Sequence, residues 1–185
     1  MILPHFNLLA HATHGSASGF VSGLAHPVGG LDHILAMVAV GLWGAQLKKP
    51  AIWMLPVAFP MAMAFGGALG VIGVAIPGVE VGIALSAVVL GLMVLLEARP
   101  PLWVAGVLVA VFAIFHGHAH GTELPHGADG TLYSVGFVIS TGLLHGVGIA
   151  IGLLHKFDWG AKVVRAGGLL VLLGGCYFLY SAIAS

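Results

Sequence analysis

Residues 26–33 read HPVGGLDH and interrupt an otherwise apolar run that extends over residues 16–46. A continuous helix of that length would measure about 46 Å, whereas the hydrocarbon core of a bilayer is about 30 Å thick. A proline and a glycine pair inside the run predict a helix break over residues 26–30, at membrane depth. Broken helices are tolerated there only where they are buried in protein or line a polar cavity, and ion sites use them repeatedly.

The composition of the whole chain indicates a membrane protein. Its 185 residues are 59% hydrophobic and 6% charged, with a mean hydropathy of +1.10. Such a chain lacks the polar surface that a soluble domain needs. A formal net charge of zero provides no basic stripe and argues against a nucleic-acid partner. The single cysteine, Cys176, excludes an internal disulfide and a thiolate metal cluster.

Six apolar runs, separated by charged or helix-breaking segments, predict an all-α membrane bundle with six main spans. The runs cover residues 16–46, 51–76, 79–96, 102–116, 132–154 and 160–184. They are too long for barrel strands and do not alternate at period two, so we expect helices. Glycines that lie four residues apart, Gly142 with Gly146 and Gly148 with Gly152, predict close helix packing in the fifth run.

The basic residues predict the orientation of the bundle. All of them fall in or beside connections on one face: Lys48, Lys49, Arg99, Lys156, Lys162 and Arg165. The positive-inside rule predicts that this face is cytoplasmic and that both termini lie on the extracytoplasmic side of a bacterial inner membrane. The four tryptophans lie near the same face and are predicted to be interfacial anchors: Trp43, Trp53, Trp103 and Trp159.

We expect two parts along the chain. Residues 16–185 would form a single transmembrane domain, and residues 1–15 an extracytoplasmic N-terminal segment. The apolar start of that segment, residues 1–10, has no positive n-region. It is therefore a candidate remnant of a signal peptide rather than a complete one.

Histidine is the commonest titratable residue, with eleven copies. Ionisable groups at membrane depth usually mark an ion or substrate path, and neutral imidazole is the commonest side-chain metal ligand. In the first motif, Asp32 would supply charge, and His26 and His33 would supply affinity. Met37, one turn beyond His33, could add a soft contact. The alternative is that Asp32 caps the second helical piece and each histidine satisfies a buried carbonyl.

A second motif, HGHAHGTE, occupies residues 116–123. If this segment is helical, His116, His120 and Glu123 share one face, and His118 points away. Histidines at i and i+4 are a common way to hold a divalent ion. The alternative is a polar, glycine-rich loop that happens to contain histidine.

Further residues are candidates for a path or for ion recruitment. Four histidines are predicted to lie in outer segments, where they would recruit the ion: His11, His14, His118 and His126. His145 lies near mid-depth and is either a path residue or a partner in a core hydrogen bond. Glu97 is predicted first to pair with Arg99 and second to serve as an exit site. Most candidate ligands are predicted to lie in the extracytoplasmic half of the bundle, as expected for an importer.

Together the two motifs resemble the paired signatures of the HupE/UreJ family. They read His26-Pro-Val-Gly-Gly-Leu-Asp32-His33-Ile-Leu-Ala-Met37 and Phe115-His116-Gly-His-Ala-His120-Gly-Thr-Glu123. That family comprises bacterial membrane permeases for nickel, and in some members cobalt, associated with hydrogenase and urease maturation. The resemblance covers essentially the whole chain. It implies a metal path made of these residues: His26, Asp32, His33, His116, His120 and Glu123.

We therefore expect a permease, not an enzyme, that imports a divalent transition metal, nickel first and cobalt next. The ion would be its substrate rather than a tightly bound cofactor. The chain carries no nucleotide-binding motif, and an inside-negative potential would contribute about 4.6 kcal/mol per 100 mV to the entry of a divalent ion. Lipid is an implied partner, and a homo-oligomer is left open. The rival hypothesis is an intramembrane hydrolase that uses Asp32 or Glu123 to activate water on zinc held by these residues: His26, His33 and His116.

Overall fold

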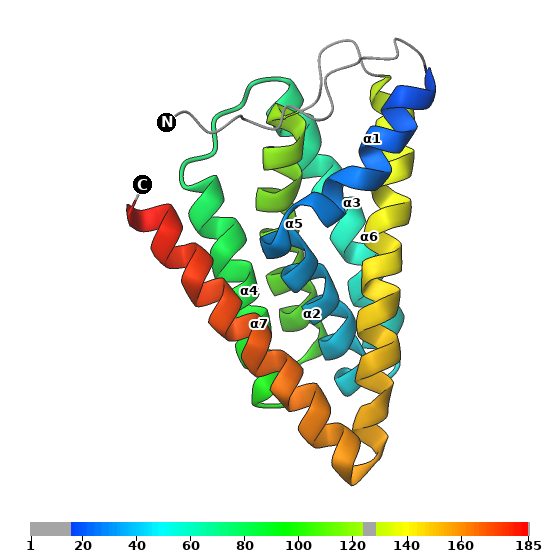
Figure 1. Ribbon diagram of the computed structural model, residues 1–185, viewed down its shortest axis with the longest axis vertical. Coiled ribbons are helices and arrows are strands. Elements are labelled where there is room, and N and C mark those ends of the chain that lie inside the picture. The colour runs from blue at the N-terminus through cyan, green and yellow to red at the C-terminus, as the bar shows by residue number, and fades with distance from the viewer. Residues whose placement is uncertain (1–15, 124–128, 185) are drawn as a thin grey trace, which may run out of the picture.

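The computed structural model describes residues 16–123 and 129–184, and these residues form a helical bundle that contains no strand (Figure 1). The main helices are α1 (Ser16–Gly29), α2 (Leu31–Leu47), α3 (Ala51–Val71), α4 (Val79–Leu95), α5 (Leu102–Thr122), α6 (Gly130–Gly152) and α7 (Asp158–Ala184). A short 3-10 helix, η1 (Leu153–Lys156), joins α6 to α7. The all-α prediction is confirmed. Three predicted recruitment residues and the predicted segment 1–15 lie outside the described residues: His11, His14 and His126.

The first apolar run is broken, as its length and composition predict. The axes of α1 and α2 differ in direction by 82°, and Gly30 between them has an extended backbone with φ −113° and ψ 121°. A Cβ atom at position 30 would lie 2.7 Å from Oδ1 of Asp32. Glycine is therefore needed here for space, because the carboxylate folds back over the break.

Four described helical segments are long and apolar enough to cross a membrane alone: α3, α5, α6 with η1, and α7. The bent pair of α1 and α2 counts as a fifth span if the two pieces cross together. The remaining apolar helix, α4, has 17 residues and is about 26 Å long, slightly less than the hydrocarbon core. Six crossings and the side that faces the cytoplasm therefore stay predictions.

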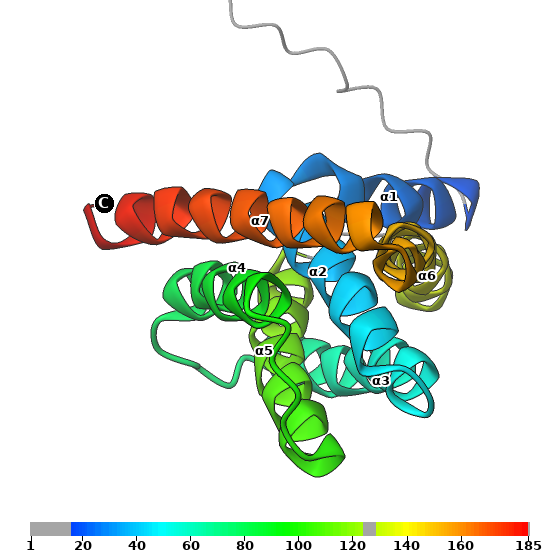
Figure 2. The same cartoon turned by 90° about the horizontal axis from the view of Figure 1, so that it is seen from below.

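Helix α2 is the centre of the bundle. It contacts α1, α3, α4, α6 and α7, and Figure 2 shows it enclosed by the other helices. From Ala36 to Gln46 every residue except Val38 is buried. The most extensive pairings around it are α3 with α5, α4 with α7, and α6 with both α1 and α2. An apolar core of this kind fixes the positions of the polar residues at one end of α2.

The second motif is helical, which corrects the predicted end of the fourth run at His116. α5 continues to Thr122 because its glycines are packing points rather than breakers. A Cβ at Gly117 would lie 1.9 Å from the carbonyl oxygen of Met63, and a Cβ at Gly121 would lie 2.2 Å from that of Gly67. The α5 backbone thus rests directly on α3, and the loop alternative for residues 116–123 is wrong.

Only one of the two glycine pairs in α6 lies at a close contact with another helix. Gly148 and Gly152 lie against α2, where added Cβ atoms would meet the carbonyl oxygens of Val38 at 2.2 Å and Leu42 at 3.0 Å. Added Cβ atoms at the other pair would meet nothing within 4 Å, so the prediction of close packing at these two residues is wrong: Gly142 and Gly146.

Trp43 is also not the interfacial anchor that was predicted. It is fully buried, and its Nε1–H donates a hydrogen bond to the carbonyl of Ala98, which follows α4. The indole therefore ties α2 to the connection between α4 and α5. The other three tryptophans are well exposed on the outside of the bundle, as an anchor requires: Trp53, Trp103 and Trp159.

Candidate metal site

Three donors from the two motifs meet where α1 ends and α5 ends. The ligand atoms of His26, His120 and Glu123 all lie within 4.8 Å of one another. Nε2 of His26 is 3.4 Å from Oε2 of Glu123. His26 is in the last turn of α1, His120 is in the last turn of α5, and Glu123 follows α5 directly. Two imidazoles and one carboxylate at this separation can hold a divalent transition metal. We call these three residues the outer cluster.

Asp32 and His33 open α2 beside the outer cluster. Oδ1 of Asp32 accepts hydrogen bonds from the backbone N–H and from ring Nδ1–H of His33, both at 2.9 Å. A carboxylate only accepts, so the ring proton is on Nδ1 and Nε2 keeps its lone pair. That Nε2 atom is buried without a hydrogen-bond partner. Asp32 therefore orients the His33 ring so that Nε2 is free to bind a metal. The alternative that Asp32 caps α2 is wrong, because the N-cap residue is Gly30.

Four imidazole rings form a continuous chain from the outer cluster into the bundle. The ring centroids of His26 and His120 are 4.6 Å apart, and those of His120 and His33 are also 4.6 Å apart. The centroids of His33 and His116 are 4.8 Å apart. The exposed fraction of the side chain is 58% for Glu123 and 28% for His26, whereas His116 is fully buried. The structure thus brings the two motifs together along a line that leads inward.

A polar cavity of about 430 Å³ surrounds most of these donors. It is lined by the outer cluster, by Asp32 and His33, and by two polar residues that sequence reasoning had not assigned to the site, Ser22 and Glu80. Glu80 lies in the first turn of α4. The signal that could have found it is its charge at the start of an apolar run, since acids there are expensive.

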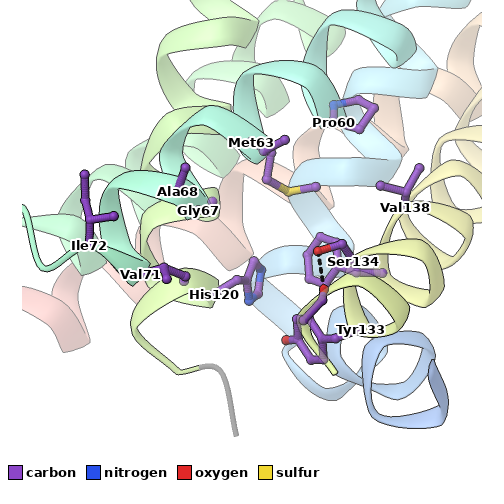
Figure 3. A pocket seen from close by; sticks show the side chains of 15 residues that line it. Pro60, Met63, Gly67, Ala68, Val71, Ile72, His120, Tyr133, Ser134 and Val138 are labelled. Carbon is purple, nitrogen blue, oxygen red and sulfur yellow. Dashed lines mark hydrogen bonds between the residues drawn. The ribbon is translucent and has the colours of Figure 1, made fainter. Parts of the chain in front are cut away.

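A second cavity, also of about 430 Å³, lies between α3, α5 and α6 and is mostly apolar. Figure 3 shows Met63, Val71, Val138 and the ring of His120 around it. His120 borders both cavities. An apolar lining cannot replace the hydration shell of an ion, so a cation at His120 would be stabilised only on the side of the polar cavity.

Other predicted residues lie apart from this site. Met37 is fully buried within the apolar core. His118 belongs to α5 rather than to an outer loop, and its Nε2–H donates to the carbonyl of Val74 at 2.7 Å. His145 is buried beside the ring of Phe59 at 5.3 Å. Neither ring nitrogen of His145 has a hydrogen-bond partner, so the core hydrogen bond considered for this residue is not formed.

The predicted ion pair between Glu97 and Arg99 is wrong. Both residues are among those described, and neither the pair nor any other ion pair of Glu97 is present there. Glu97 follows α4 in a left-handed conformation with φ 51°, and Arg99 is exposed. A surface pair at such a turn would contribute little stability.

The zinc site expected for a hydrolase is not assembled. In the part of the chain that the structure describes, the outer cluster is the group of three histidine, cysteine or acidic residues with donor atoms this close. The set proposed for zinc, His26, His33 and His116, is not such a group. His33 and His116 act as neighbours further along the chain of rings instead.

Comparisons with known proteins agree with the motifs. Residues 1–178 match the sequence model of the family described as HupE / UreJ protein. Protein HupE of Rhizobium leguminosarum bv. viciae is 46% identical over 172 residues, which cover 92% of this chain and 90% of that protein. No solved structure matches the chain significantly. The chain therefore belongs to the HupE/UreJ family of membrane proteins.

Proposed function

We propose that this membrane protein is a permease that imports a divalent transition metal, with nickel as the first candidate and cobalt as the second. The observation that carries the proposal is the chain of imidazoles that runs from the half-exposed outer cluster to the buried His116. Imidazole and carboxylate suit nickel, cobalt, zinc and copper alike. The order nickel before cobalt rests on the family resemblance, and so do the inner membrane and the supply of nickel to hydrogenase or urease maturation.

Capture would begin at the outer cluster. Glu123 is the most exposed of the three donors and would meet the hydrated ion first. Three protein ligands leave coordination positions for water, so the ion would lose its hydration shell in stages. The acids Asp32 and Glu80 line the same cavity, and they would offset the two positive charges. Conduction also requires that the site release its ion, and the water ligands that remain would keep the ion exchangeable.

Transfer would proceed from His120 to Nε2 of His33 and then to His116, because adjacent rings are less than 5 Å apart. Beyond His116 the core is closed, since Met37, Val40 and Leu90 are fully buried. Release to the other side therefore requires this packing to open. The membrane potential would favour that direction by about 4.6 kcal/mol per 100 mV for a divalent ion.

The test is metal uptake into proteoliposomes under a fixed, inside-negative potential. We expect His120→Ala to lower nickel uptake by at least about 10- to 100-fold, because loss of a residue that merely orients a metal ligand already has an effect of that size. His118→Gln is the matched control on the same helix, because it keeps an N–H donor for the carbonyl of Val74 and lies outside the cavity. We expect its uptake to remain near that of the unmodified protein.

Equal uptake by His120→Ala and the unmodified protein would refute the proposal. Equal losses of uptake in His120→Ala and His118→Gln would refute it as well. Competition among nickel, cobalt and zinc in the same assay ranks the substrates. A hydrolase would leave uptake unchanged when donors are removed, so the same measurement separates the two functions.

A further inference from the structure

We infer that Ser86 is a positioning residue of the metal path: its hydroxyl sets the tautomer of His116 so that Nδ1 of that ring is free to receive the ion. The inference rests on the proposed function and extends it to α4, a helix that contains neither histidine motif. Ser86 and His116 are both fully buried.

The argument begins with the single proton of the Ser86 hydroxyl. Oγ of Ser86 is 2.5 Å from the carbonyl oxygen of Ile83 and 2.9 Å from Nε2 of His116. A carbonyl oxygen can only accept, so the short contact with Ile83 takes the hydroxyl proton. Oγ must then accept from His116, and the ring proton is therefore on Nε2.

This tautomer leaves Nδ1 of His116 with a lone pair. The Nδ1 atom is buried and has no hydrogen-bond partner. Unpartnered buried polar atoms are uncommon in proteins, and each one calls for an explanation. Nδ1 of His118 is also unpartnered, so the position of the ring decides: His116 adjoins His33, and its dry lone pair is what a cation passing along these rings would coordinate. The opposite tautomer would present an N–H group, which repels a cation.

His33 shows the same arrangement with the nitrogens exchanged. Asp32 accepts from Nδ1–H of His33, and Nε2 is the free atom. Both neighbouring rings thus have one nitrogen occupied by a protein acceptor and one left open. Metal-binding histidines generally donate their second N–H in this way, and loss of the acceptor weakens metal binding or activity about 10- to 100-fold.

A purely structural reading makes a different prediction. A buried serine in a helix can donate to a carbonyl of the preceding turn without any role beyond that bond. In that case the tautomer of His116 would not depend on Ser86, and removal of the hydroxyl would leave transport unchanged.

Nitrogen-15 NMR on the full chain, labelled at histidine and held in lipid nanodiscs without metal, reads the tautomer directly. His116→Gln identifies the His116 signals by difference. We expect Nε2 to be protonated and Nδ1 unprotonated in the unmodified protein, and we expect Ser86→Ala to lose this preference. A protonated Nδ1 in the unmodified protein would overturn the inference, whether or not any variant folds.

Nickel uptake supplies the functional half of the test. Ser86→Ala should lower uptake about 10- to 100-fold at equal protein level, and Ser86→Thr should restore it because the hydroxyl is kept. Ser140→Ala, which removes a buried hydroxyl from α6, is the matched control and should transport normally. Normal uptake by Ser86→Ala would overturn the inference, and so would a folded Ser86→Thr that fails to transport. Neither result would affect the proposed function, which His120→Ala decides.

Discussion

Replacement of Gly117 by alanine should be one of the most damaging single-methyl changes in this protein. Gly117 lies between His116 and His118 on α5, at the contact with α3. Its added Cβ would lie 1.9 Å from the carbonyl oxygen of Met63, 2.7 Å from the carbonyl carbon of that residue and 2.9 Å from the backbone nitrogen of Gly67. All three obstacles are backbone atoms, so no side-chain rotation relieves the clash.

The geometry sets the size of the effect. An ordinary contact to a Cβ atom begins near 3.4 Å, so the two helices must separate by about 1.5 Å at this point. Overpacking of a tight interface costs about 1–3 kcal/mol. Because the added Cβ meets backbone atoms of α3 that cannot rotate away, we expect a cost of about 3 kcal/mol. That corresponds to about a 100-fold change in the unfolding equilibrium. For a chain of this size it lowers the Tm by about 6–12 °C.

Thermal unfolding of the purified protein in detergent, followed by size-exclusion chromatography, measures the Tm. Gly146→Ala is the matched control, since an added Cβ at that helical glycine meets nothing within 4 Å, and we expect no loss of stability. A displacement of 1.5 Å is large beside the spacing of 4.6–4.8 Å between the rings, so nickel uptake should fall as well. If Gly117→Ala unfolds within about 2 °C of the unmodified protein, the reasoning about this helix contact is refuted.

Two further predictions concern the break and the buried tryptophan. Gly30→Ala should reduce nickel uptake with little change in Tm. Its Cβ would meet side-chain atoms rather than backbone, Oδ1 of Asp32 at 2.7 Å and Nδ1 of His33 at 3.1 Å. Unchanged uptake would count against the role proposed for the Asp32 carboxylate. Trp43→Phe should lower the free energy of unfolding by about 1–3 kcal/mol, because the carbonyl of Ala98 loses its donor; a thermal melt checks this, and an unaltered Tm would show that the hydrogen bond contributes nothing.

The features that could be predicted from the sequence are those set by local chemistry. The break in the first run follows from its excess length together with a proline and two glycines, all within a few residues. The shared face of His116, His120 and Glu123 follows from helical periodicity alone, once the segment is taken as a helix. The helical character of all six runs follows from their composition and length.

The features that could not be predicted depend on partners far away in the chain. Gly117 and Gly142 are both glycines within predicted helices, yet Gly117 lies against the backbone of α3 and Gly142 faces open space. The buried indole of Trp43 finds its hydrogen-bond acceptor 55 residues later, at the carbonyl of Ala98. Glu80 and Ser86 reach the histidines only because α4 packs against α2 and α5. The charge of Glu80 at the start of an apolar run marks that residue for attention, but no pattern within α4 indicates which helices it meets.

The sharp bend at Gly30 has a consequence for how related proteins can diverge. His26 is carried by α1, which lies on α6 through close backbone contacts such as that of Gly23 with Tyr133. His33 is carried by α2, which packs against α6 as well and also against α3, α4 and α7 (Figure 2). Both helices thus rest on α6, but only α2 is also held by α3, α4 and α7 through extensive contacts. Under the proposed function, substitutions on the exposed side of α1, at positions such as Val21 and Val28, would alter the entrance for ions while the core around α2 stays intact.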